Sequence, residues 1–133
     1  REVYMGISNN KLLSALKELG VDVEGTVSRF ADNDELYVKF LLRYPDEDKL
    51  TPVKEAFASG DYENLSKAAH KLKGVSINLG MVSLAEKAGE IESRAKSADD
   101  ETNGIEAVLY AVEAEYREIC RIIGENADIP QTV

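Results

Sequence analysis

Apolar residues recur at every third or fourth position through most of this chain, and that spacing constrains its fold most strongly. Amphipathic helices have this period because one face packs on a core while the other meets water. Strict alternation of apolar and polar residues is absent, and β-branched residues are scattered, so strands have little support. The pattern predicts an all-α protein.

Three long helices are expected in the second half of the chain. Asp61 can cap the first of them and Gly80 can end it, while Gly124 can end the last. The three apolar stripes are Leu65, Ala68, Ala69, Leu72, Val75 and Leu79; Met81, Leu84, Ala85, Ala88, Ile91 and Ala95; and Ile105, Val108, Leu109, Val112, Tyr116, Ile119 and Ile123. Short loops between such helices favour antiparallel neighbours, so we expect an antiparallel up-and-down four-helix bundle with an N-terminal helical extension.

The first half of the chain is less regular. Ser8 or Asn9 can cap a short helix that Gly20 ends, and residues 23–30 suggest another helical turn. Pro45 interrupts the helical pattern of residues 34–59, which leaves open whether this segment is one kinked helix or two; an irregular long arm is favoured. The predicted organisation is a single domain over 1–133, with a bundle core at about 34–124, short N-terminal helices at 8–30 and a flexible tail at 125–133.

Composition excludes several classes of function. The net charge of −9 disfavours nonspecific binding to nucleic acid or to anionic membranes. No apolar run approaches the roughly 18 residues that would cross a bilayer, and a lone Cys120 fits a reducing compartment, so a cytoplasmic protein without membrane contact is expected. No phosphate-binding glycine loop, dinucleotide fingerprint or metal-ligand cluster is present. The partner should therefore be a protein or a small molecule.

The single histidine has the most informative surroundings. At about 100° per residue, His70 falls roughly 160° from the centre of its helix's apolar stripe, so its ring should project into solvent from the middle of a packed helix. An exposed imidazole with a pKa near 6.5 offers a neutral nitrogen nucleophile at cytoplasmic pH. Lys73, one turn beyond, can offer an ammonium to a phosphoryl group, and Gly74 leaves space for a partner to approach the ring.

Further residues on the expected outer face are candidates for docking a partner: Ser66, Lys67, Lys71 and Ile77. Residues 66–80 contain three lysines and no carboxylate, a basic patch that would attract an acidic partner surface. Simpler interpretations also exist. Lys71 can be an ordinary solvated charge, Gly74 and Gly89 can serve helix packing, and Lys87 can be solvated rather than directed at the histidine.

The run His70-Lys71-Leu72-Lys73-Gly74-Val75-Ser76-Ile77-Asn78-Leu79-Gly80, followed by Leu84-Ala85 and Glu90-Ile91-Glu92, resembles the signature of histidine-containing phosphotransfer (HPt) domains of bacterial phosphorelays. The resemblance covers roughly residues 20–124. It implies a monomeric carrier that takes a phosphoryl group from a receiver phosphoaspartate and passes it to another receiver. His70 matches the phosphoacceptor, Lys73 the lysine that steadies the phosphoryl group, and Gly74 the clearing glycine.

The same resemblance implies the partners and cofactors. These are response-regulator receiver domains and a hybrid histidine kinase, with Mg²⁺ held by the receiver and no cofactor in this chain. Val75 stands where many relatives have a small residue. Two alternatives remain at the level of sequence: a phosphoacceptor domain excised from a larger chemotaxis-type or hybrid histidine kinase, and a noncatalytic bundle that only docks a receiver.

Overall fold

The computed structural model describes residues 2–97 and 102–126, and this part of the chain is helical without any strand. The prediction of an all-α protein is therefore confirmed. The helices are α1 (Glu2–Leu19), α2 (Val23–Arg29), α3 (Asp34–Glu47), α4 (Leu50–Ser59), α5 (Tyr62–Asn78), α6 (Val82–Ser97) and α7 (Thr102–Glu125). No helix in the described ranges is long and apolar enough to span a membrane.

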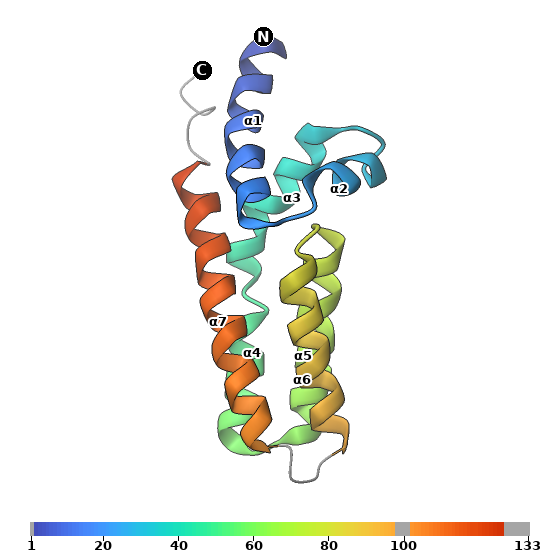
Figure 1. Cartoon of the computed structure of the whole chain (residues 1–133), viewed down its shortest axis with the longest axis vertical. Coiled ribbons are helices and arrows are strands. Elements are labelled where there is room, and N and C mark those ends of the chain that lie inside the picture. The colour runs from blue at the N-terminus through green and yellow to red at the C-terminus, as the bar shows by residue number, and fades with distance from the viewer. Residues whose placement is uncertain (1, 98–101, 127–133) are drawn as a thin grey trace.

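Helices α4, α5, α6 and α7 run alongside one another in the lower half of Figure 1 and enclose one part of the core. The same core cluster continues through buried residues of α1 and α3. Helix α5 packs against α4 and α6, and α7 packs against α6, α4, α3 and α1. The predicted stripes supply the buried side chains, and each large one contributes about 1.5–3 kcal/mol when it leaves water. The fully buried residues from these helices include Val53, Leu65, Leu72, Leu84, Ile91 and Val112.

The N-terminal extension differs from its prediction. Helix α1 begins at Glu2, ahead of Ser8 and Asn9, so the predicted short helix starting at residue 8 is wrong. Ser and Asn cost only a fraction of a kcal/mol inside a helix, so a residue that can cap a helix does not oblige one to begin there. Helix α2 is close to the predicted turn, and residues 127–133 of the predicted tail lie outside the described residues.

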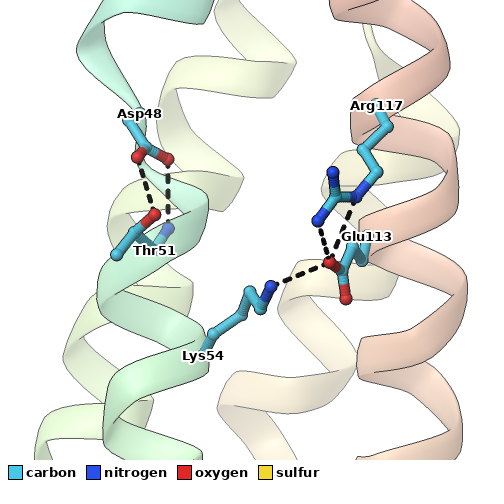
Figure 2. Close-up of polar contacts among 5 residues, drawn as sticks. All are labelled: Asp48, Thr51, Lys54, Glu113 and Arg117. Atoms are coloured by element: carbon cyan, nitrogen blue, oxygen red, sulfur yellow. Dashed lines mark hydrogen bonds and ion pairs between the residues drawn. The ribbon is translucent and has the colours of Figure 1, made fainter.

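Segment 34–59 is two helices, and the break falls after Pro45 rather than at it. Pro45 lies inside α3, and the chain turns at Asp48, whose φ of +40° is left-handed. The Asp48 carboxylate accepts hydrogen bonds from the Thr51 amide at 3.1 Å and the Thr51 hydroxyl at 2.6 Å (Figure 2). The bond from the Thr51 hydroxyl is the main reason that the pKa of Asp48 lies below its usual value. Asp48 therefore caps the start of α4 and stabilises the turn.

A polar bridge then attaches α4 to α7. The Glu113 carboxylate on α7 accepts hydrogen bonds from Lys54 of α4 at 2.8 Å and from Arg117, one turn along α7, as Figure 2 shows. Because hydrogen bonds from these two cations favour the ionised carboxylate, the pKa of Glu113 is lowered. The bridge fixes the lateral position of α4, which forms one flank of α5.

The C-terminal end of α5 is fixed by α2 and α3. Arg29 donates to the Ile77 carbonyl at 3.2 Å, and the buried Tyr37 hydroxyl donates to the Leu79 carbonyl at 2.8 Å. The Ile77 carbonyl also accepts from the Gly80 amide, whereas the bond from Tyr37 satisfies a carbonyl that the end of a helix leaves unpaired. Gly80 follows with φ +84°, and a Cβ there would lie 2.3 Å from Thr26 Oγ1 and 2.6 Å from the Asp22 carbonyl oxygen. The position and rotation of α5 are therefore set at this end, which determines where its outward residues point.

Candidate functional site

His70 lies in the middle of α5 on its exposed side. Its side chain is 65% exposed, as the helical spacing predicts, while Ala69 and Leu72 of the same helix are fully buried. The capping Asp61, which accepts from the Asn64 amide at 3.1 Å, begins the helix well before the ring. The imidazole is thus held on a rigid, packed element and is open to a second protein.

One ring nitrogen is already engaged. His70 Nδ1 lies 3.0 Å from Glu92 Oε2 on α6. An ionised carboxylate can only accept hydrogen bonds, so Nδ1 must carry the proton and donate it. In the neutral imidazole this choice leaves Nε2 with the lone pair. The contact therefore leaves Nε2 as the nitrogen with a free lone pair on an exposed ring.

Glu92 is the centre of the site. Its side chain is only 11% exposed, and its two oxygens also meet the ammonium groups of Lys73, 3.0 Å from Oε1, and Lys96, 3.3 Å from Oε2. Burial raises the pKa of this carboxyl, but hydrogen bonds from Lys73, Lys96 and His70 outweigh it, and the pKa lies below its usual value. Two ammonium groups against one carboxylate leave one excess positive charge beside the ring, and such a charge attracts anions.

The role of Glu92 was missed by reasoning from sequence, which noted it only within the Glu90-Ile91-Glu92 segment. A usable signal was present: Glu92 lies four residues after Ala88 and next to Ile91, at the edge of the buried stripe of α6. A carboxylate rarely occupies such a position unless it is paired.

Lys73 reaches Glu92 across a notch in α6. A Cβ added at Gly89 would lie 3.1 Å from Lys73 Cδ, so the missing side chain makes room for the lysine to cross between the helices. The packing interpretation of Gly89 therefore holds in a specific form. Lys87, by contrast, bonds to Ser83 and Glu115 and is directed at α7 rather than at the histidine.

Gly74 borders open space. A Cβ at this position would have no atom within 4 Å outside its own surroundings in the helix, so Gly74 does not serve helix packing. The helix accepts a residue that costs about 1 kcal/mol relative to alanine, one turn from the histidine. The open surface next to the ring agrees with a steric role toward a partner.

The structure separates the candidate docking residues into exposed and buried ones. Lys67, Lys71 and Ile77 are exposed, Ile77 to 41%. Ser66 is only 8% exposed, so its expected place on the outer face is wrong. Ser66 precedes Lys73 by two helical turns and shares the side of α5 that packs against α6, so the buried arc of α5 is wider than its apolar stripe.

Cys120 lies apart from this site. It is a free, half-buried cysteine on α7 beside Tyr116, and burial raises the pKa of its thiol. A thiol with a raised pKa is a weak nucleophile at neutral pH, which agrees with a structural role.

Comparison with known proteins places the chain in a family. The family model of the Hpt domain matches residues 46–121, more than half of the chain, and the chain belongs to this family. Searches of curated proteins and of solved structures gave no match. Hpt domains take part in phosphotransfer in two-component signalling, interact with response-regulator receiver domains, and are phosphotransfer carriers rather than kinases.

The lowered pKa of Glu92 predicts a dependence of stability on pH. A carboxyl whose folded pKa is depressed contributes stability above its unfolded value of 4.5 and loses it as the pH falls through the lower folded value. We expect Glu92→Gln to lower the free energy of unfolding at pH 6–7 by on the order of 1 kcal/mol, and the difference from the parent to shrink below pH 4.

Urea unfolding of both proteins from pH 7 to pH 3 measures this difference. Glu86→Gln is a suitable control, because Glu86 is an exposed α6 carboxylate, and it should change stability little at any pH. A difference between Glu92→Gln and the parent that stays constant through pH 3 would contradict the proposed ion pairing.

Proposed function

We propose that this chain accepts a phosphoryl group on His70 Nε2 from a receiver phosphoaspartate and passes it to the aspartate of another receiver. The observation that carries the proposal is the hydrogen bond between His70 Nδ1 and the buried Glu92, 3.0 Å long, on a ring that is otherwise exposed. Membership of the Hpt family supports the chemistry.

The transfer needs no general base. The Nε2 lone pair forms a bond to phosphorus while the bond between phosphorus and the aspartyl oxygen breaks, and the aspartate leaves as a carboxylate. Nε2 has no proton to lose, and Nδ1 keeps its proton throughout. The ring gains positive charge as the new bond forms, and the Glu92 carboxylate at Nδ1 stabilises that charge. Lys73 and Lys96 offset the negative charge of the incoming phosphoryl oxygens.

The proposal also covers the fold of the chain, its location and its cofactors. The chain acts as a single-domain, monomeric carrier in the cytoplasm, with α3–α4, α5, α6 and α7 as an antiparallel up-and-down four-helix bundle. It holds no cofactor, and the receiver supplies Mg²⁺. The net charge of −9 supports a protein partner over nucleic acid.

The primary test is transfer of phosphate from a phosphorylated receiver in the presence of Mg²⁺. The parent should acquire an acid-labile phosphoryl adduct, and His70→Gln should acquire none, because an amide has no nucleophilic nitrogen of this kind. Equal labelling of both proteins would refute the proposal. If the parent binds the receiver but forms no adduct with any donor, the chain is a docking bundle instead. If labelling needs ATP and a separate kinase core rather than a receiver, it is the acceptor domain of a kinase.

The clearance at Gly74 gives a second prediction. Gly74→Ala should slow transfer from a receiver several-fold, and Gly74→Leu more than tenfold, because each side chain enters the space one turn from the ring. Gly124, in α7, also has no atom within 4 Å of an added Cβ and provides the matched control.

Alanine at either glycine should leave the fold intact and stabilise it by up to about 1 kcal/mol, since both lie in helices. Stopped-flow or rapid-quench transfer, with thermal unfolding alongside, separates the two effects. Transfer by Gly74→Leu at the parent rate would show that the space has no role in docking.

A further inference from the structure

One flank of α5 is basic toward its N-terminal end and mainly apolar toward its C-terminal end. His70 and Gly74 lie next to this flank, near the middle of the helix. At about 100° per residue, Lys67 and Lys71 lie roughly 60° and 100° around the helix from His70, in the direction away from Lys73 and α6. This flank faces α4, and near its C-terminal end it borders a groove that α3 helps to line. Gly74 lies on the same side, so the open surface beside the ring leads directly onto it.

The N-terminal part of the flank is a basic hollow. A depression of about 320 Å³ lies between the start of α4 and α5, and no carboxylate lines it. It is lined by Lys49, Pro52, Asn64, Lys67, Ala68 and Lys71. We refer to these residues as the basic hollow.

The positive charges of the three lysines in the basic hollow are almost unpaired with carboxylates. Within the described part of the chain, Lys49 and Lys71 make no ion pair, and Lys67 approaches only Glu63, at 3.7 Å between two exposed side chains. Such a surface pair contributes little. By contrast, Lys17, Lys54, Lys73, Lys87 and Lys96 all contact carboxylates within 3.3 Å. In a protein of net charge −9, three nearly free ammonium groups around one depression form a local positive potential.

The C-terminal part of the flank is mainly apolar, with a few polar side chains at its edge. A groove of about 480 Å³ runs between α5 and the α2–α3 region. Its apolar walls are Phe30, Phe40, Val75 and Leu79, and Arg29, Glu47 and Asn78 complete the lining. Phe40 of this groove is among the most exposed large apolar side chains of the described residues. A partner that covers the ring from this side would thus meet apolar surface at one end of α5 and positive charge at the other.

We propose that the basic hollow receives the carboxylates of an acidic segment that borders the active-site pocket of the receiver, while an apolar patch of the same receiver covers the groove. This inference rests on the proposed function and adds a criterion for the partner. Receivers with an acidic rim on one side of the pocket are selected, and the two unlike ends of the flank fix the orientation in which the phosphoaspartate meets Nε2.

Charges at the rim of an interface act mainly on the rate of encounter and on its dependence on salt. Reversal of the lysine charges should therefore slow association with the receiver without changing the reactivity of His70. The hollow lies on the side of α5 away from α6 and Glu92. Effects on association and effects on the reactivity of His70 can therefore be separated.

The test compares two double variants with the same change in net charge. Lys67→Glu with Lys71→Glu alters the basic hollow, and Lys11→Glu with Lys17→Glu alters exposed lysines on α1. Transfer from a phosphorylated receiver is measured with Mg²⁺ at 50 mM and 500 mM NaCl, and binding of the unphosphorylated receiver by calorimetry. At low salt we expect the hollow variant to show at least tenfold slower second-order transfer and at least tenfold weaker binding, and the α1 variant to stay within about threefold of the parent. High salt should shrink the difference, and adding Lys49→Glu should enlarge it at low salt.

Phosphoramidate, a small donor that needs no docking surface, separates this inference from the function on which it rests. Equal labelling of His70 by phosphoramidate in both variants, with slow transfer from the receiver only in the hollow variant, supports the inference. If the hollow variant and the α1 variant bind and react with the receiver alike at low salt, the inference is wrong even though His70 carries phosphate. If the parent binds the receiver but is labelled by neither donor, the carrier function is wrong, and the binding comparison still decides whether the hollow docks an acidic surface.

Discussion

The carboxylate of Glu92 links the two helices that build the site. It comes from the buried edge of α6, yet its oxygens meet the imidazole and two ammonium groups at the surface. A buried carboxylate without partners would be costly, so the three contacts are what permit a charge at this depth. The same contacts determine the tautomer of His70 and the local charge around it. Most of the chemistry that we assign to the chain follows from this one side chain.

Glu92 can perform this role only because α5 is held in a fixed rotation. Bonds from Arg29 and Tyr37 fix its C-terminal end, the close approach of Gly80 to Asp22 fixes the turn that follows, and the Glu113 bridge places α4 beside it. A rotation of α5 by one residue would turn the ring by about 100° and break the contact with α6. The irregular first half of the chain thus supports the geometry of the site.

The features that depend on one helix could be predicted from sequence. Helical spacing was enough to place His70, Lys67, Lys71 and Ile77 on the exposed side of α5, because the apolar stripe of that helix is continuous. Features that depend on two helices could not: the burial of Ser66 and the link from Lys73 to Glu92 both arise where α5 meets α6. The sequence left open whether residues 34–59 form one helix or two, because Pro45 is the stronger local breaker, whereas the bond that Asp48 accepts from the Thr51 amide defines the actual turn.

The central claim is that Glu92 keeps the proton on Nδ1 and leaves Nε2 to react. The most direct measurement is the site of attachment in the ¹⁵N-labelled, phosphorylated protein, read from the ring nitrogen that couples to ³¹P in the NMR spectrum. This account predicts that the phosphoryl group is bonded to Nε2 of His70. A phosphoryl group on Nδ1 would contradict it, because that nitrogen could then no longer donate to Glu92.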